Sequence, residues 1–276
     1  MKNKKHFLVW LTILLGLVLT ACVVVSLVLH RDRNMPPEDT VPKVTTLPPP
    51  EENQLTPMDF GYVDGYLTCL TRESILGVDV SSYQQEVDWQ QVKDAGFEFA
   101  MLRAGFRGYG DSGVMKEDSF AQTNYQNAKA AGLQVGAYFF SQAITVEEAI
   151  EEAQFLLEIV KDWELDMPLV FDWECLQDNY RTVGVTPRQL TDFAKAFCET
   201  VKGAGHRVMV YFNPNQSRRD MYLSELTDYG FWLAMYSDNM NYAYKVDMWQ
   251  YTRSGSVPGI RGKADINLYF PNIYPD

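Results

Sequence analysis

The residues best suited to chemistry are two acids, Asp172 and Glu174, at the end of an apolar run that starts at Leu169. A short apolar run of this kind, preceded by a proline and followed by polar residues, predicts a buried strand. Side chains alternate between the two faces of a strand, so Asp172 and Glu174 point the same way. Leu169 and Trp173 then point the other way, into apolar packing.

The spacing of these two acids suits the cleavage of a glycosidic bond. Two residues along a strand cover roughly 6.5–7 Å, which is within the range of separations that paired catalytic carboxyl groups use. Ionising one of two neighbouring acids disfavours ionising the other, so one of them can keep a proton and act as a general acid. The same Asp-x-Glu pattern also fits a solvated pair on an ordinary strand, and the rest of the chain must distinguish the two interpretations.

The elements that would position these acids follow the pattern of βα units. Helices predicted over 88–95, 120–131 and 187–203 are each followed by a glycine that leads directly into an apolar strand (Gly96, Gly132 and Gly205). Glycine at this position supplies the left-handed cap of a helix. Two further signals mark helix starts, because Thr145 and Thr186 each stand three residues before Glu148 and Gln189. Helix–glycine–strand repeats predict a parallel sheet.

The predicted fold class is therefore α/β, a flattened, incomplete (β/α) barrel of the TIM-like kind. About eight strands are expected, over 75–81, 97–104, 133–141, 169–174, 206–212, 231–236, 246–251 and 264–267, with few helices in the C-terminal part. In such barrels the reactive groups gather at the carboxyl ends of the strands. The polar side chains at these strand ends are thus expected to meet at one mouth.

Composition excludes several classes of function. The chain has 276 residues and a formal net charge of −12, which argues against binding to the phosphates of a nucleic acid. Its three histidines and four cysteines show no C-x-x-C or other metal-ligand spacing, so no metal and no cofactor is expected. Cys69, Cys175 and Cys198 leave one disulfide or three free thiols open, and Cys175, which faces away from Glu174, is expected to be buried.

The N-terminal part divides into segments by composition. Residues 1–33 are predicted to be a cytoplasmic stub and a transmembrane anchor, because lysines precede an uncharged apolar run over 7–29 that is long enough to span a bilayer. A lipoprotein cleavage box ending at Cys22 is the rival interpretation. Residues 34–57 are rich in Pro, Thr and Glu and predict an extended linker. Residues 58–74 form an entry segment of uncertain structure, and 75–276 form the catalytic domain.

A series of motifs then appears in a recognisable order. These are Gly77-Val78-Asp79-Val80-Ser81, Arg103-Ala104-Gly105, Gly136-Ala137-Tyr138, Asp172-Trp173-Glu174, Tyr211-Phe212-Asn213, Trp249-Gln250-Tyr251 and Asp265-Ile266-Asn267. Together they resemble the family 25 glycoside hydrolases, the muramidase type of lysozyme. The resemblance runs from about residue 75 to 270.

The resemblance implies a peptidoglycan hydrolase that cleaves the β-1,4 bond between N-acetylmuramic acid and N-acetylglucosamine. By position, Glu174 matches the general acid, Asp172 its partner carboxylate, and Asp79 and Asp265 two further acids of the same cluster. Asp172 would either orient the substrate's acetamido group for attack on the anomeric carbon or activate a water molecule. The sequence leaves these two routes open.

The remaining candidates are expected to contact the sugar chain. Rings and hydroxyl groups of Tyr138, Tyr211, Tyr236 and Trp249 could line a groove, and Gln250 and Arg103 could bond hydroxyl groups or neighbouring acids. Peptidoglycan strands and, through the N-terminal helix, the membrane are the expected partners of a monomeric enzyme at the cell surface. A catalytically silent wall-binding module and a glycosidase acting on another N-acetylhexosamine polymer are the alternatives.

Overall fold

The computed structural model describes residues 47–175 and 181–271 of the chain. The predicted membrane anchor and most of the predicted linker lie outside these residues, so both stay predictions. Within the described part of the chain, none of the helices has the length and apolar character needed to cross a membrane. Residues 47–276 form one compact unit.

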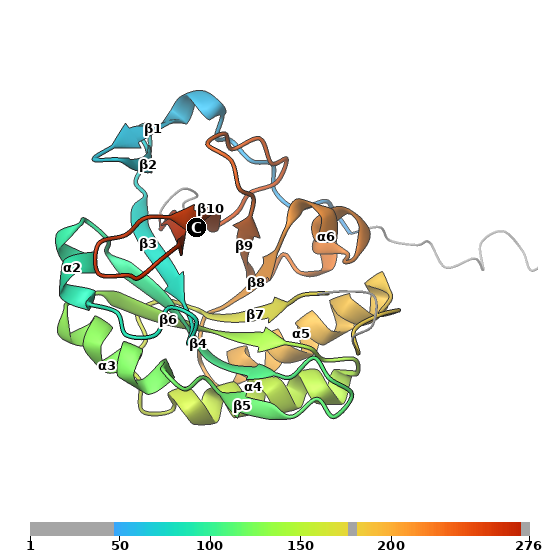
Figure 1. Ribbon diagram of the computed structural model, residues 1–276. Helices are drawn as coiled ribbons and strands as arrows, with labels where there is room; N and C mark the ends of the chain where they lie inside the picture. The colour runs from blue at the N-terminus through green and yellow to red at the C-terminus, as the bar shows by residue number, and fades with distance from the viewer. Residues whose placement is uncertain (1–46, 176–180, 272–276) are drawn as a thin grey trace, which may run out of the picture. The chain divides into compact units, whose positions relative to one another are not determined.

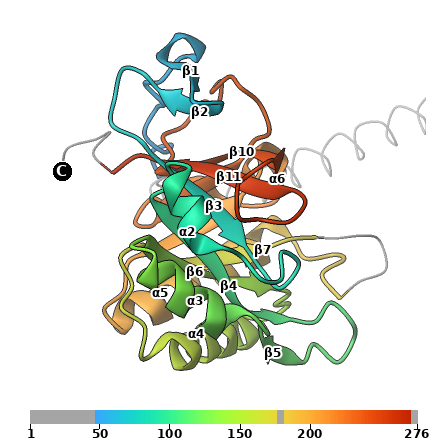
Figure 2. The ribbon, with the colours of Figure 1, turned by 60° about the vertical axis from the view of Figure 1, so that its left-hand side comes forward.

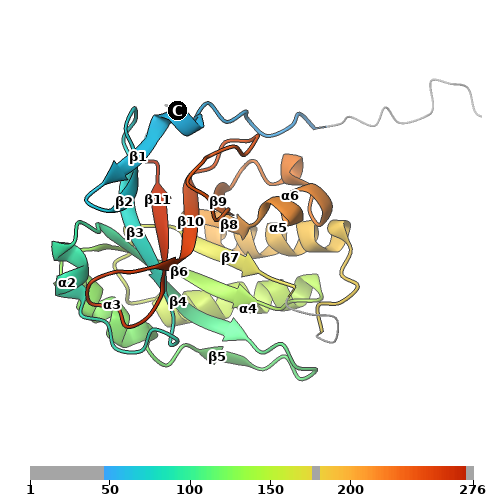
Figure 3. The same cartoon turned by 45° about the horizontal axis from the view of Figure 1, so that its top comes forward.

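Eight strands close into a barrel. They are β3 (Ile75–Val80), β4 (Phe99–Arg107), β6 (Gln134–Ser141), β7 (Leu169–Trp173), β8 (Val208–Phe212), β9 (Gly230–Ala234), β10 (Met248–Gly255) and β11 (Ala264–Tyr269). The order β3-β4-β6-β7-β8-β9-β10 is parallel throughout, and β11 lies antiparallel between β10 and β3. The α/β barrel of about eight strands is thereby confirmed, although the sheet itself is closed rather than incomplete (Figure 3).

The helices, by contrast, form an incomplete outer layer. They are α2 (Trp89–Asp94), α3 (Ala121–Ala130), α4 (Val146–Val160), α5 (Pro187–Gly203) and the short α6 (Pro214–Arg219). Helices α3, α4 and α5 lie along β4, β6 and β7 (Figure 1). The predicted caps are confirmed: Thr145 and Thr186 accept from the amides of Glu148 and Gln189. The three predicted cap glycines have positive φ angles of 91°, 78° and 88°.

A hairpin covers strands that carry no helix. β1 (Phe60–Val63) and β2 (Tyr66–Cys69) pair antiparallel within the segment of uncertain structure, and the hairpin stands at the top of the view in Figure 2. The Phe60 ring packs edge-on against Trp249 at 5.2 Å. Upstream, Glu52 bridges to Tyr244 and Leu55 is buried, so the last residues assigned to the linker already belong to the folded unit.

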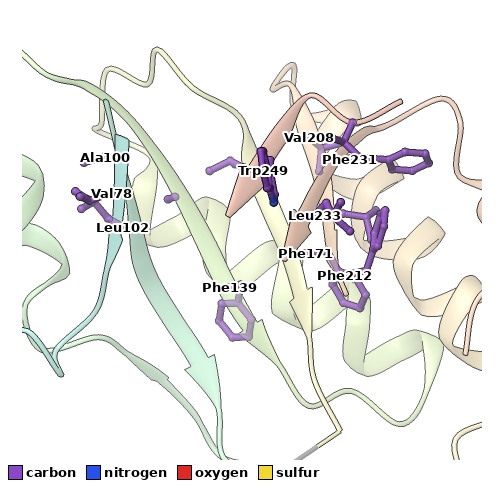
Figure 4. Packing of buried hydrophobic residues seen from close by; sticks show 14 of the residues in the cluster. Val78, Ala100, Leu102, Phe139, Phe171, Val208, Phe212, Phe231, Leu233 and Trp249 are labelled. Carbon is purple, nitrogen blue, oxygen red and sulfur yellow. The ribbon is translucent and has the colours of Figure 1, made fainter. Parts of the chain in front are cut away.

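Apolar packing falls into two layers, one on each side of the barrel wall. The outer layer lies between strands and helices and includes Phe139, Phe171 and Phe212 (Figure 4). The inner layer fills the barrel and consists of Phe99, Met101, Met167, Val170, Met209, Trp232 and Met248. Gly77 makes room for it, because a Cβ atom there would lie 2.3 Å from the Phe99 ring. This inner layer closes the barrel beneath the carboxyl ends of its parallel strands.

Candidate active site

The two acids of the central strand lie as the alternation of β7 predicts. Asp172 is buried and points into the barrel mouth, and Glu174, one residue beyond the strand end, lines the same cavity. Leu169, Phe171 and Trp173 face the outer apolar layer. The Trp173 indole donates to the carbonyl of Ala143 at 2.9 Å, which anchors the strand end from behind.

A cavity of about 230 Å³ opens at the carboxyl ends of the strands. Of the residues predicted from the sequence, all but Trp249 line it: Asp79, Asp172, Glu174, Asp265, Arg103, Tyr138, Tyr211, Tyr236 and Gln250. They come from all eight strands of the barrel or from the one or two residues that follow a strand. The closed barrel is what brings together groups that are up to 186 positions apart, as for Asp79 and Asp265.

Asp79 is the centre of the acid cluster. One of its carboxylate oxygens accepts from Gln250 Nε2 at 2.8 Å and from Asn267 Nδ2 at 2.7 Å. Burial raises the pKa of Asp79 to about 6, and the two amide donors limit that rise because they favour the charged form. Near neutral pH this carboxyl group therefore carries a negative charge in the middle of the site.

The other three acids respond to that charge. Asp265 stands directly opposite Asp79 in the β3–β11 ladder, and burial and the Asp79 charge raise its pKa to about 8. Burial and repulsion from Glu174 and Asp79 raise the pKa of Asp172 well above its ordinary value. Burial and Asp79 also raise the pKa of Glu174. The site thus holds protonated carboxyl groups beside an ionised one, which is the arrangement that general-acid catalysis requires.

Gln250 connects two tyrosines to the cluster. Its Oε1 atom accepts from the hydroxyl groups of Tyr211 at 2.9 Å and Tyr236 at 3.2 Å, while its Nε2 atom donates to Asp79. Because both tyrosines donate, the amide can take only one orientation. Tyr236 remains half-exposed at the cavity mouth, and Tyr138 lies within the wall against Trp232.

Arg103 occupies the rim and pairs with an acid outside the cluster. Its Nε atom donates to Asp118 at 2.8 Å and its Nη2 atom donates to Ser82 at 3.0 Å. The guanidinium also lies 5.4 Å from the centre of the exposed Tyr83 ring. The pocket acids consequently have no ion pair with Arg103, although its positive charge opposes the rise in the pKa of Asp172.

Two expectations about individual side chains are wrong, each for its own reason. Trp249 does not line the cavity, because Gln250 takes the inward position and the indole packs outside the barrel, donating to the carbonyl of Met235 at 2.7 Å (Figure 4). Trp249 is therefore not one of the residues that could contact a substrate in this cavity. Cys175, expected to be buried, is exposed, since the strand has already ended before it. Cys69 and Cys198 are buried free thiols.

Sequence reasoning missed several residues of the cavity. Trp232 forms part of its floor and donates to Asn267 Oδ1 at 2.9 Å, which in turn orients the Asn267 amide toward Asp79. Asn267 was visible in the sequence as the second residue after Asp265, on the same face of its strand. Phe140 and Arg253 also line the cavity. Phe140 lies two residues after Tyr138 on the same face of β6, so alternation could have identified it. Arg253 lies in the part of β10 beyond the predicted strand end at residue 251.

Fold and site together define a class: an α/β barrel with a cluster of four acids at one mouth, where its parallel strands end. The family-specific comparison agrees with this class. Residues 78–260 match the model of glycosyl hydrolases family 25, and the chain belongs to that family.

Individual relatives show the same relationship. The chain is 29% identical over 200 residues to the autolytic lysozyme of Clostridium acetobutylicum, an alignment that covers 71% of this chain and 56% of that protein. Among solved structures, a family 25 glycosyl hydrolase from Bacillus anthracis is 25% identical, with a TM-score of 0.57, and the match covers 72% of this chain and 90% of the other.

The modular autolysin LytC from Streptococcus pneumoniae, solved with a synthetic peptidoglycan ligand, shares the fold with a TM-score of 0.64 and 21% identity. That match covers 72% of this chain and 47% of LytC. The chain thus spans only about half the length of this autolysin and of the clostridial lysozyme.

Proposed function

We propose that this protein is a muramidase that hydrolyses the β-1,4 bond between N-acetylmuramic acid and N-acetylglucosamine in peptidoglycan. The observation that carries the proposal is the position of Glu174. It lies in an open cavity on the same face as Asp172, and burial together with the ionised Asp79 raises its pKa. Family membership and relatives named as lysozymes support the substrate class.

Glu174 is the general acid in this proposal. Its carboxylic proton passes to the glycosidic oxygen as the bond to the anomeric carbon breaks, so the leaving sugar departs as an alcohol. Asp172 is the partner carboxyl group, and Asp79 and Asp265 set the charge of the site. The anomeric configuration of the first product distinguishes the two roles of Asp172: retention identifies help from the acetamido group, and inversion identifies a water molecule activated by a base.

The cavity walls supply the sugar contacts. Tyr138, Tyr211 and Tyr236 present rings or hydroxyl groups, and Gln250 and Arg103 present amide and guanidinium groups around the acids. Sugars combine apolar ring faces with hydroxyl edges, so a site that alternates aromatic and polar side chains suits them.

The test uses the full chain in mild detergent, with purified peptidoglycan as substrate. Wild type should release fragments that end in reducing muramic acid, identified by mass. Glu174→Gln keeps the shape of the side chain but has no transferable proton, so its rate should fall by about 10²–10⁴-fold. Equal rates in both proteins would contradict the role of Glu174.

Two outcomes would favour other functions. Binding to the wall with no product from wild type would identify a silent binding module. Faster cleavage of chitin oligomers than of peptidoglycan would identify a glycosidase acting on another N-acetylhexosamine polymer.

For location, the proposal rests on the sequence alone. The apolar run over 7–29, followed by a Pro-rich segment, supports a tether that holds a monomeric enzyme at the outer face of the cell membrane. Deleting residues 1–33 should move the protein from the membrane fraction to the soluble fraction.

A further inference from the structure

The backbone that carries Glu174 lies beyond the sheet ladder. On one side of β7 the last pair joins Ser141 to Trp173, and on the other side the last pair joins Asp172 to Tyr211. Glu174 follows these pairs, and its carboxyl group makes no hydrogen bond to a described residue. The direction of this carboxyl group must therefore be set by the position of the backbone at Trp173 and Glu174.

Gln142 holds this backbone from the β6 side. It follows the last residue of β6 and is fully buried. Its Nε2 atom donates to the carbonyl of Glu174 at 2.7 Å and to that of Ser141 at 2.8 Å. Both partners are carbonyl oxygens, so only the amide nitrogen can face them. The two bonds continue the connection between β6 and β7 by one residue past the point where the ladder stops.

Gln216 holds the same backbone from the β8 side. It lies in α6, directly after β8, and its Nε2 atom donates to the carbonyl of Trp173 at 2.8 Å. Its Oε1 atom accepts from the backbone N and the Nδ2 of Asn213, at 3.0 and 2.7 Å, in the capping box of α6. The start of α6 thus holds the Gln216 side chain in place, and Gln216 in turn holds the backbone at the end of β7.

We infer that Gln142 and Gln216 are positioning residues for the general acid. Their buried amides donate to the successive carbonyl groups of Glu174 and Trp173 and thereby direct the Glu174 carboxyl group into the cavity. The inference rests on the proposed function, because it assigns the amides to the proton-transfer step. Neither amide lines the cavity, so neither contacts the substrate. Their removal should act on proton transfer alone, since a misplacement of about 1 Å costs about 10²-fold in rate.

The experiment replaces each amide by methionine in the full chain, because methionine has a similar length and no hydrogen-bond donor. Gln142→Met and Gln216→Met should lower kcat on peptidoglycan about 10²-fold with little change in KM. Gln189→Met is the matched control. Gln189 completes the capping box of α5 as Gln216 completes that of α6, but it does not contact β7. The control should keep wild-type kcat.

A second substrate separates positioning from general damage. An aryl glycoside with a nitrophenolate leaving group departs without a proton, so loss of general-acid aid affects it little. Both variants, like Glu174→Gln, should therefore lose far less on the aryl glycoside than on peptidoglycan. Equal losses on both substrates, or a kcat within about two-fold of wild type, would overturn the inference.

Folding of each variant is checked by its thermal unfolding, and if Gln142→Met does not fold, Gln216→Met decides the question. Failure of the proposed function has a different signature. In that case wild type itself gives no product, or Glu174→Gln remains as active as wild type.

Discussion

Buried acids lie both outside and inside the barrel wall, and their surroundings differ. On the outer face, Glu152 of α4 is fully buried and has a partner for each oxygen. Arg107 Nε donates to one oxygen at 2.7 Å, and the Ser141 hydroxyl donates to the other at 2.5 Å. Burial raises the pKa of Glu152 to about 7, but the hydroxyl and the guanidinium both oppose that rise.

On the inner face, four acids share one cavity without a bonded cation. Asp79 has only neutral amides as partners, and Asp172 Oδ1 is buried without a partner among the described residues. Of the two arginines that line the cavity, Arg103 is bound to Asp118 and Ser82, and the guanidinium of Arg253 lies 5.2 Å from the centre of the Tyr236 ring. An arrangement made only for stability would place a cation in such a site. The outer acid thus connects elements of the fold, whereas the inner acids have no bonded cation among the described residues, as the proposed proton transfer requires.

The largest effect is expected at Asp172, where one substitution should lower activity and raise stability. Asp172→Asn should lower the rate of peptidoglycan hydrolysis by at least about 10²-fold, because it removes the partner carboxyl group. The same variant should be more stable than wild type to urea at pH 7, since asparagine is neutral in both states. Unfolded Asp172 ionises at this pH, whereas folded Asp172 resists ionisation.

Hydrolysis rates and urea midpoints, measured on the same preparation, check both halves of this prediction. The stability gain should shrink toward pH 4, where the unfolded aspartate also becomes protonated. A variant that is both less active and less stable would place Asp172 with structural acids such as Glu152.

Loss of the cation that pairs with the outer acid, Glu152, should instead lower the stability of the fold. Arg107→Met removes the cation from the fully buried Glu152 and should destabilise the fold by about 3–5 kcal/mol. Arg188→Met is the matched control, because Arg188 also bonds two acids, Asp192 and Glu225, but at the surface. Its loss should cost no more than about 1 kcal/mol. Similar losses in the two variants, measured by urea unfolding, would contradict the contrast between buried and exposed pairs.

Whether a feature depends on one segment or on distant parts of the chain explains how much of it the sequence could predict. Strand alternation places Asp172 and Glu174 on one face, and the capping residues Thr145 and Thr186 mark two helix starts. These signals are local, so one chain segment is enough to interpret them. Strand ends predicted that polar side chains meet at one mouth of a barrel, and the resemblance to the family identified the four acids among them.

The rest depended on distant parts of the chain. The outward direction of Trp249 follows from its own segment once Gln250 takes the inward position. What that segment could not show is the partner of the outward ring, the hairpin residue Phe60, 189 positions earlier. The closure of the sheet also follows from long-range pairing, since β11 returns antiparallel to β3. The Gln142 and Gln216 contacts bond side chains to the backbone of another strand, and no sequence pattern marks such bonds.

The smallest effect per measurement is expected in how stability depends on pH, where one half-unit step changes it by less than about 1 kcal/mol. The pKa of Asp265 is about 8 in the folded protein, above the value of 3.8 for a free side chain. Between these values the folded state holds a proton that the unfolded state has lost, so stability falls as pH rises from about 4 to about 8. Asp79 contributes with the same sign up to about pH 6. A single group adds a slope of at most about 1.4 kcal/mol per pH unit.

Asp265→Asn should therefore make this decline shallower, which urea midpoints measured at half-unit steps of pH would show. Glu199→Gln is the control, because the Tyr229 hydroxyl lowers the pKa of that exposed acid. Its contribution is present above its unfolded pKa and is lost only as pH falls below about 4.3. The control should thus match the wild-type slope between pH 5 and 8. If Asp265→Asn matched it as well, Asp265 would be an ordinary ionised acid, and the proton reserve of the cavity would rest on Asp172 and Glu174.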